Sequence, residues 1–473
     1  MTTRRPALIL LATCLGLFVG QLDTTAVNLA LPAMGRDLGG AIAGQQWIVD
    51  AYNLAFAALL LTGGTLGDRF GRRRMFVIGA SSFLTGSVIC ALAPNLATVV
   101  VGRAVQGGGA AMMLPQSLAI IAVAFPERSE RNRAMSVWSA VAAIGLAAGP
   151  TVGGVMVDLF GWSSIFWVNV PVCAAAVSLA LRYVPETEDP NARRLDPAGQ
   201  FLAIVLLASL TFAVVEGQRQ GWTSALILTS GVVALGCLAA FLAVEQRSAQ
   251  PMLPLGLVRR GQLPVAAVVA ACMTFGMYGM FMLASLNLQQ DRGAAPIVAG
   301  LQMLPLPVVF ALVSPYTGRL VTRIGPRLPM TAGLSLMGFG LVAYAALGAH
   351  ANLLLLELAF MVIGLGLALN TGPVVAVAVS AVDADRAGLA SGVANLARMF
   401  GAALGVAVMG TVLAVVGDGA HSGPGFVTGL RAALLVGAAV ELAGAAVCLR
   451  KIRNPGDRPV APRAREPEPA TQR

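Results

Sequence analysis

Long apolar stretches alternate with short polar segments along almost the whole chain. Most apolar stretches reach about twenty residues, the length of helix that crosses the hydrocarbon core of a bilayer. The pattern therefore predicts an all-α membrane protein with 14 transmembrane helices. We place these helices at residues 7–31, 45–66, 75–93, 97–123, 134–158, 163–183, 197–216, 224–244, 263–288, 296–317, 329–348, 352–379, 388–415 and 426–449.

Composition supports this interpretation and excludes a soluble globular protein. Hydrophobic residues make up 57% of the chain, charged residues only 11%, and the mean hydropathy is +0.78. A net charge of +10 would suggest nucleic-acid binding in a soluble protein. Here the arginines form short clusters between apolar stretches, where they determine topology instead. We therefore expect no nucleic-acid partner.

The arginine clusters also test the number of spans, because cytoplasmic loops carry the excess of basic residues. With a cytoplasmic N-terminus, only Arg36, Arg219, Arg292 and Arg431 fall outside. One miscounted span would scatter this asymmetry, so both termini are predicted to be cytoplasmic in a multi-pass plasma-membrane protein. The first apolar run is too long for a cleaved signal peptide and is expected to remain as the first span. The cytoplasmic segments hold Arg4 and Arg5; Arg69, Arg72, Arg73 and Arg74; Arg128, Arg131 and Arg133; Arg182, Arg193 and Arg194; Arg247, Arg259 and Arg260; Arg319, Arg323 and Arg327; Arg386; and the tail from Arg450.

An internal repeat divides the chain. The Arg-rich turn Gly64–Arg74 returns in degraded form at Gly318–Arg327, about 254 positions downstream. Such repeats are typical of transporters that rock around a central site. We expect an N-terminal six-helix bundle at 1–184, a linker with two additional transmembrane helices at 185–262, a C-terminal six-helix bundle at 263–449, and a disordered cytoplasmic tail at 450–473.

Four motifs carry a family resemblance over nearly the whole chain. They are the turn Gly64–Arg74, the segment Arg103–Gly109, the segment Gly145–Gly154 and the segment Leu22–Pro32. In this order and spacing they resemble the major facilitator superfamily, and within it the fourteen-span drug:proton antiporters. The resemblance implies a major-facilitator-type fold of two pseudo-symmetric six-helix bundles plus two extra helices, and proton-driven export by alternating access.

Three charged residues in the predicted spans of the first half are candidates for proton coupling. A carboxylate at Asp23 costs about 2.5–3.5 kcal/mol on insertion scales unless it faces a cavity or binds a proton, and the resemblance supports a proton-coupling role. The alternative is a helix-to-helix hydrogen bond without a part in transport. Asp50 is either a second proton-coupling or cation-binding group or a solvated carboxylate near the outer surface. Arg103 lies too deep to reach water, so we expect it to pair with Asp23 and share in proton coupling.

The first Arg-rich turn is predicted to be a cytoplasmic gate formed by Gly64, Asp68, Arg69, Gly71, Arg72 and Arg73. Charge pairs between Asp68 and the arginines, together with a neighbouring helix N-terminus, would lock one conformation. The second copy has Thr322 in place of the acid, so the acidic latch belongs to the first half alone. The alternative is that the arginines only anchor the topology.

The predicted fifth span carries an antiporter helix motif. Gly145, Gly149, Pro150, Gly153 and Gly154 remove side chains along one stretch and allow another helix to approach closely. A hinge at Pro150 is a further hypothesis. A comparable series in the twelfth span, Gly364, Gly366, Asn370, Gly372 and Pro373, echoes Gly107 to Pro115 and makes Asn370 a candidate for facing the cavity.

Several other residues are candidates for the wall of a substrate cavity near the bilayer midplane: Asn28, Gln106, Met277, Tyr278, Asn370, Asn395 and Arg398. Methionine and aromatic residues crowd the ninth span, where they would form either a wall for flat lipophilic substrates or ordinary lipid-facing packing. Glu216 and Glu357 lie near the outer surface and are expected to be solvated, whereas Glu441 lies deeper.

Other chemistries find no support. The six cysteines lie in apolar spans without metal-ligand spacing, and neither His350 nor His421 lies inside a span. No phosphate-binding GxxxxGK[ST] sequence is present, and no nucleophile with a base can be assembled. We therefore expect a protein that is not an enzyme, binds no metal or cofactor, and uses the proton gradient as its energy source.

The function predicted from the sequence is proton-coupled secondary export, by antiport, of hydrophobic or cationic drugs. The protein would act as a monomer. One alternative is a dedicated exporter of a single metabolite or self-made antibiotic. An alternative from another class is a membrane sensor that binds lipophilic ligands without moving them.

Overall fold

The computed structural model describes residues 6–39, 42–189, 196–248, 261–347, 352–382, 387–452 and 454, and all regular structure in them is helical. Within these residues, 13 helices are long and apolar enough to cross a membrane, or 14 when the bent helix α2 is counted as one span. The predicted fold class is confirmed. The helices are α1 (Pro6–Leu38), α2 (Ile42–Phe70), α3 (Arg72–Ala91), α4 (Leu96–Ala124), α5 (Arg128–Phe160), α6 (Ser164–Tyr183), α7 (Pro197–Gln220), α8 (Ala225–Arg247), α10 (Leu263–Leu286) with its π-helical extension η1 (Asn287–Asp291), α11 (Pro296–Met303), α12 (Pro305–Ile324), α13 (Arg327–Leu347), α14 (Leu353–Ser380), α15 (Ala387–Val416) and α16 (Gly423–Lys451).

Some predictions fall outside this description. They concern Arg4, Arg5, Arg193, Arg194, Arg259, Arg260, Arg386 and His350, and the cytoplasmic tail 450–473 apart from residues 450–452 and 454. The domain boundaries at 184 and 263 stay predictions.

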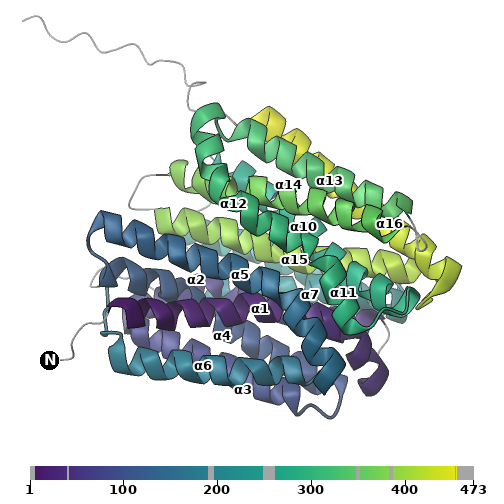
Figure 1. The fold of residues 1–473 in the computed structure, drawn as a ribbon, viewed down its shortest axis with the longest axis horizontal. Coiled ribbons are helices and arrows are strands. Elements are labelled where there is room, and N and C mark those ends of the chain that lie inside the picture. Colours follow the sequence, from purple (N-terminus) through teal and green to yellow (C-terminus); the bar gives the residue numbers. More distant parts are fainter. Residues whose placement is uncertain are drawn as a thin grey trace, which may run out of the picture.

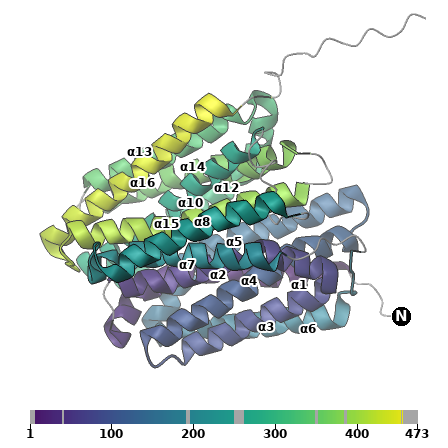
Figure 2. The ribbon, with the colours of Figure 1, turned by 180° about the vertical axis from the view of Figure 1, so that it is seen from behind.

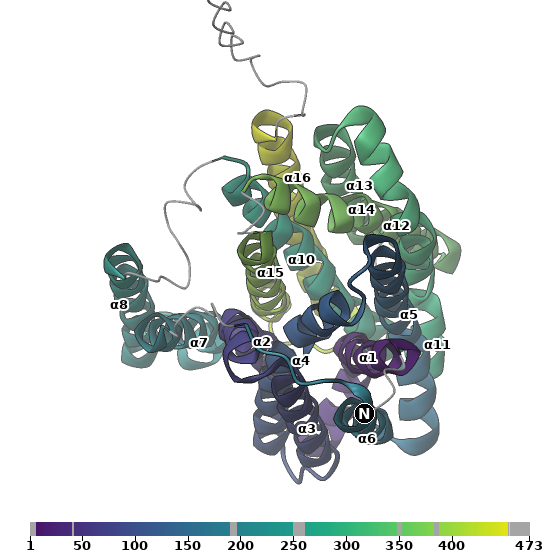
Figure 3. The same cartoon turned by 90° about the vertical axis from the view of Figure 1, so that its left-hand side faces the viewer.

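Helices α1 to α6 lie together on one side of the molecule, and α10 to α16 lie on the other (Figure 1). Seen from behind, α7 and α8 cover the junction between the two groups (Figure 2). The view along the helices shows α8 outermost and α7 between it and α2 (Figure 3). Helix α7 contacts both α2 and α15, so this added pair of helices touches both bundles.

The internal repeat extends from the Arg-rich turns into helix packing. In the first bundle, Gly79 of α3 lies against the backbone of Gly109 on α4. In the second bundle, Gly333 of α13 lies in the same way against Gly366 of α14. A side chain at any of these positions would collide with the facing backbone, so glycine permits the close approach. The two halves therefore share one packing scheme.

Several hydrogen bonds join the two bundles at the ends of their helices that lie away from the N-terminus. Near the end of α1, the carbonyl of Asn28 accepts a hydrogen bond from Ser285 of α10, and Leu29 O accepts one from Gln289 Nε2 at 3.0 Å. At the start of α2, Gln46 Nε2 donates to Ala407 O of α15 at 2.7 Å. If the N-terminus is cytoplasmic as predicted, these contacts close the outer side.

Helix α2 bends by 50° between its segments Ile42–Leu60 and Thr62–Phe70. Gln200 of α7 lies at this bend, where its Nε2 donates to Ala58 O at 2.7 Å and its Oε1 accepts from the Thr62 hydroxyl. An uncharged side chain from an added helix therefore holds the backbone of α2 at the point where its direction changes.

Candidate functional site

A buried ion pair lies at the centre of the N-terminal bundle. Nη1 of Arg103 on α4 donates to Oδ2 of Asp23 on α1, and each side chain is only 1% exposed. The structure thus brings together the two residues that the sequence predicted to pair. Both charges are held away from water, where an ion pair is stable only if its remaining polar atoms are also satisfied.

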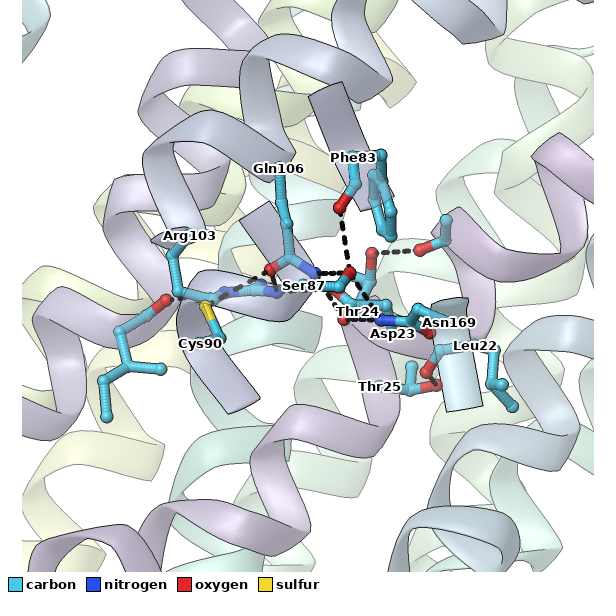
Figure 4. A network of polar contacts seen from close by, with 12 residues as sticks. Leu22, Asp23, Thr24, Thr25, Phe83, Ser87, Cys90, Arg103, Gln106 and Asn169 are labelled. Atoms are coloured by element: carbon cyan, nitrogen blue, oxygen red, sulfur yellow. Dashed lines mark hydrogen bonds and ion pairs between the residues drawn. The ribbon is translucent and has the colours of Figure 1, made fainter. Parts of the chain in front are cut away.

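Asp23 is surrounded by amide donors (Figure 4). Its Oδ1 accepts hydrogen bonds from Asn169 Nδ2 of α6 at 2.9 Å and from Gln106 Nε2 of α4 at 3.3 Å. Both amides also donate to the hydroxyl of Ser87 on α3, at 3.3 and 2.8 Å. These donors stabilise the ionised form of the carboxyl group. Sequence reasoning missed Asn169 and Ser87 and assigned Gln106 to the substrate cavity; the signal available was that each is a polar residue inside an apolar span.

Arg103 also ties α4 to α2. Its Nε donates to Ile48 O at 3.0 Å, its Nη1 donates to Gln106 Oε1 at 2.9 Å, and its guanidinium lies 4.5 Å from the centre of the Tyr52 ring. A guanidinium over an aromatic face gains a cation–π interaction. A change in the charge of Asp23 would therefore be transmitted from α1 through Arg103 to α2.

The corresponding positions of the second bundle are apolar. When Gly79 is aligned with Gly333 and Gly109 with Gly366, three positions of the network can be compared. Ser87 then corresponds to Leu341, Arg103 to Phe360 and Gln106 to Ile363. These three residues are each 1% exposed and form part of an apolar core. The polar network thus belongs to one half of the repeat.

A small cavity lies beside the network. It has a volume of about 10 Å³, roughly the space of one water molecule, and its lining includes Asp23, Asn169 and Gly153 of α5. The cavity therefore lies where α1, α5 and α6 meet, next to the carboxyl group. Water there would give Asp23 a partner for proton exchange.

Asp50 is fully buried in α2, contrary to the alternative of a solvated carboxylate. Neither of its carboxylate oxygens has a hydrogen-bond partner among the described residues, and the same holds for the side-chain amide of Asn53, one helical turn further on. A buried carboxylate without a partner is costly in its charged form. Asp50 therefore fits a neutral, protonated carboxyl group or a site that receives a positive charge from a ligand.

The charge pairs of the predicted gate agree with the expectation for Arg72 but not for Arg69 and Arg73. Asp68 pairs with Arg72 at 2.9 Å, one turn along the chain, while Arg69 lies over the ring of Phe70. Arg73 instead pairs with Glu186 at 3.5 Å. Gly71 has φ 104°, a conformation that favours glycine, and it separates α2 from α3.

Glu186 is a component of this turn that sequence reasoning missed. Its carboxylate accepts hydrogen bonds from the backbone N–H groups of Arg73 and Arg74, at 3.0 and 3.2 Å. An anion at a helix N-terminus is favourable because the first N–H groups lack partners within the helix. The segment after α6 is thus fastened to the start of α3. At Gly64, by contrast, an added β-carbon would lie 3.9 Å from Pro115, so close packing does not require glycine there.

The glycines of the antiporter motif serve two contacts. A β-carbon at Gly145 would lie 3.0 Å from Phe18 O, one at Gly153 would lie 2.9 Å from Ala26 Cα, and one at Gly149 would collide with Thr25, so this face lies on α1. Gly154 instead faces Pro296 and Ile297 of α11, and the carbonyl of Pro150 lies against Gly300. The motif therefore holds α5 against α1 and, across the junction of the bundles, against α11. Pro150 lies within the continuous helix α5, and its hinge role stays a prediction.

The methionine- and aromatic-rich segment of α10 faces protein rather than lipid. Met277 is 3% exposed and Tyr278 is 8% exposed. The other members are equally buried: Met273, Phe275, Met280, Phe281 and Met282. This excludes the alternative of lipid-facing packing.

The remaining candidates for the cavity wall lie in different surroundings. Asn370 of α14 is fully buried against Gly333 of α13, and its Nδ2 donates to Gly366 O at 3.0 Å, so the prediction that it faces a cavity is corrected. It fills the space left by Gly333. Asn28 lies at the contact of α1 with α10, where its Oδ1 has no partner among the described residues. Asn395 and Arg398 lie together on α15, joined by a hydrogen bond of 3.5 Å.

The outlying acids also differ from the expectation. Glu216 is 6% exposed and accepts hydrogen bonds from Trp47 Nε1 at 3.0 Å and Arg219 Nε at 2.7 Å, so it is not simply solvated. Glu357 is half-buried. Glu441 is fully buried against Gly276 of α10, with no partner for either oxygen in the described part of the chain.

Comparison with known proteins agrees with this architecture. Among solved structures, a POT family transporter in complex with a thioalcohol-conjugated peptide superposes with a TM-score of 0.71 at 13% identity, covering 94% of this chain and 96% of that one. This likeness concerns the fold alone.

Sequence relatives are closer. The chain is 43% identical over 412 residues to the multidrug resistance protein Stp of Mycobacterium tuberculosis, covering 87% of this chain and 76% of Stp. It is 35% identical over 410 residues to the methylenomycin A resistance protein of Streptomyces coelicolor, covering 87% and 86%. The sequence profile of the Major Facilitator Superfamily matches residues 13–406 and 266–472. The chain therefore belongs to the Major Facilitator Superfamily and is a multi-pass membrane protein.

Proposed function

We propose that this protein exports small lipophilic compounds across the plasma membrane in exchange for protons, by alternating access between its two bundles. The observation that carries the proposal is the Asp23–Arg103 ion pair, which is buried, hydrogen-bonded on every side and confined to one half of a repeated structure. A purely structural ion pair gives no reason for the other half to be apolar at the matching positions. The names of the relatives, multidrug and methylenomycin A resistance proteins, support export.

The mechanism follows from the partners of the pair. Protonation of Asp23 removes the negative charge that holds Arg103 to α1, while Arg103 keeps its contacts with Ile48 and Tyr52 on α2. The link between α1 and the α2–α4 pair would then loosen. Deprotonation would restore it, because ionised Asp23 has donors ready in Asn169 and Gln106. Proton exchange at Asp23 would thus change the attachment of α1 to α2 and α4.

The contacts between the bundles support the second half of the cycle. The hydrogen bonds from Gln46, Ser285 and Gln289 to carbonyl groups of the facing bundle are few, and each can be replaced by water. Together with the packing of α5 against α11, these hydrogen bonds would close the central cavity on one side of the membrane. They would break when the cavity closes on the other side. Asp68 and Arg72, outside this interface in the present state, are proposed to stabilise the opposite state.

The experiment is transport by purified protein in liposomes with an imposed pH gradient, with ethidium as the exported probe. We expect gradient-dependent transport by the wild type and its loss in Asp23→Asn, because an amide cannot carry the proton. Asp158→Asn is the matched control, since Asp158 is exposed on α5. Undiminished transport by Asp23→Asn, or equal transport after collapse of the gradient, would refute the coupling.

A dedicated exporter of one compound is the second candidate. It is favoured by relatives named for single compounds, including the tetracenomycin C resistance and export protein of Streptomyces glaucescens, which is 35% identical over 419 residues and of which the chain covers 77%. Cells that express the protein should resist many unrelated compounds if it is a multidrug exporter, and one compound if it is a dedicated exporter. In both cases we expect a monomer that needs no cofactor.

A further inference from the structure

Arg398 on α15 is a permanent charge without a counter-ion. The ion pairs seen among the described residues are Asp23–Arg103, Asp68–Arg72, Glu186–Arg73 and Glu216–Arg219, and none involves Arg398. Its Nε is enclosed and has no hydrogen-bond partner in the described chain, and its Nη1 makes only the 3.5 Å contact with Asn395. Arg103, which also lies inside a span, has by contrast a carboxylate, two other acceptors and an aromatic ring as partners.

The missing counter-ion is significant because Arg398 lies deep in a membrane span. It is eleven residues from the start of α15, about 16 Å along the helix axis. A carboxyl group such as Asp50 or Glu441 can become neutral by binding a proton, but a guanidinium cannot lose one in a protein. A charge held at that depth needs a negative partner or water.

Arg398 lies between two contact faces of α15. One side of α15 lies on α10, where Gly401 and Gly405 touch the backbone of Ala271 and Phe275. Another side packs Ala403 against α2 of the other bundle. The helical positions of Asn395 and Arg398 fall between these two contacts, and the Arg398 side chain is half-buried.

The surroundings match an amphiphilic ligand. Tyr278 lies on α10, the helix against which this part of α15 packs, and with Met277 it belongs to the methionine- and aromatic-rich segment that faces protein. The Asn395 amide is one turn away on the same helix. The group thus combines a free guanidinium fork and an amide with an apolar, adaptable wall.

We propose that Arg398, with Asn395 and Tyr278, binds the carboxylate of an aromatic acid that the protein exports. A guanidinium binds a carboxylate through two parallel hydrogen bonds, and the geometry is specific to its planar fork. The inference rests on the proposed export function and extends it from hydrophobic and cationic compounds to acids. Loss of these hydrogen bonds costs about 1.5–3 kcal/mol, or roughly 10- to 100-fold in affinity.

The test compares rhodamine 110, which carries a free carboxylate, with rhodamine 123, its methyl ester. Binding to purified protein in detergent is followed by fluorescence anisotropy, and transport is followed in liposomes. We expect Arg398→Gln to weaken the binding and export of rhodamine 110 at least about 10-fold. The binding and export of rhodamine 123 should change less than about 2-fold. Arg398→Lys should retain part of the preference for the acid because it retains the charge but not the fork.

Arg431→Gln is the control, because Arg431 is exposed at the other end of the C-terminal bundle. An equal loss of binding and export of both dyes in Arg398→Gln would overturn the proposal. Arg398 would then have a structural role or would pair with an acidic residue in another conformation. Failure of the wild type to bind rhodamine 110 would overturn it as well. Because binding is measured without a gradient, a failure of proton coupling in the Asp23→Asn experiment is distinguished from a failure here.

Discussion

Asn169 on α6 donates a hydrogen bond of 2.9 Å to the Oδ1 atom of Asp23 on α1, on the side of the carboxyl group opposite Arg103. The amide therefore supports the ionised form from a helix that takes no part in the ion pair. It also lines the small cavity beside the carboxyl group. Asn169 thus fixes the position of the carboxyl group from outside the ion pair.

We predict that Asn169→Leu lowers the rate of gradient-driven ethidium transport in liposomes about 10-fold. Loss of one donor removes about 1.5–3 kcal/mol of stabilisation from the ionised carboxylate, which weakens the support of the ion pair with Arg103. Transport in liposomes and thermal unfolding in detergent are measured together. Ser178→Ala, which alters an exposed hydroxyl on the same helix, should change neither. Transport by Asn169→Leu at the wild-type rate would contradict the prediction.

Gly149 gives a prediction about helix packing. A β-carbon there would collide with the Thr25 side chain on α1. We expect Gly149→Ala to lower stability by about 1–3 kcal/mol, the usual effect of overpacking, with a lower thermal unfolding midpoint in detergent. Gly236→Ala on α8, where nothing lies within 4 Å, should be neutral. Combining Gly149→Ala with Thr25→Gly should restore most of the loss, and no restoration would contradict the contact.

Gln200 tests the purpose of the added helices. Gln200→Leu removes the hydrogen bond to Ala58 O and the contact with Thr62 at the bend of α2. We expect a loss of about 1 kcal/mol in stability and a slower transport rate, because α2 leads directly into the Asp68 turn. Thermal unfolding and liposome transport report the two effects. Ser230→Ala on α8 is the control, and a Gln200→Leu protein that matches it in both measurements would show that α7 does not brace the bend.

Glu186 gives a prediction outside the membrane spans. Glu186→Ala removes an anion from the N-terminus of α3 and the partner of Arg73, and about 0.5–1 kcal/mol of stability is expected to be lost. The difference from the wild type should shrink at high salt, because the carboxylate is partly exposed. Glu127→Ala, at the exposed start of α5, should cause a smaller change in the unfolding midpoint. A salt-independent loss would point to packing instead of charge.

The helices long enough to span a membrane could be predicted from the chain because the apolar runs are long and are separated by short polar segments. The repeat was visible in the Arg-rich turns, and the pairing of Arg103 with Asp23 followed from the cost of leaving either charge alone in a bilayer. These conclusions depend on local hydropathy and on charge balance, which are properties of the sequence.

Only the tertiary structure decided which way each polar side chain points. Gln106 joined the Asp23 network and Asn370 filled the space at Gly333, although both were expected at a cavity. Asn169 became a partner of Asp23, and Ser87 a partner of the amides around it, because α3 and α6 pack beside α1 and α4. Glu186, in the segment after α6, meets the first N–H groups of α3. Hydropathy fixes where a helix lies in the membrane, whereas its rotation is set by contacts between residues far apart in the chain. For the same reason Arg398 could be placed in a span from the sequence, but its lack of a counter-ion could be seen only in the folded protein.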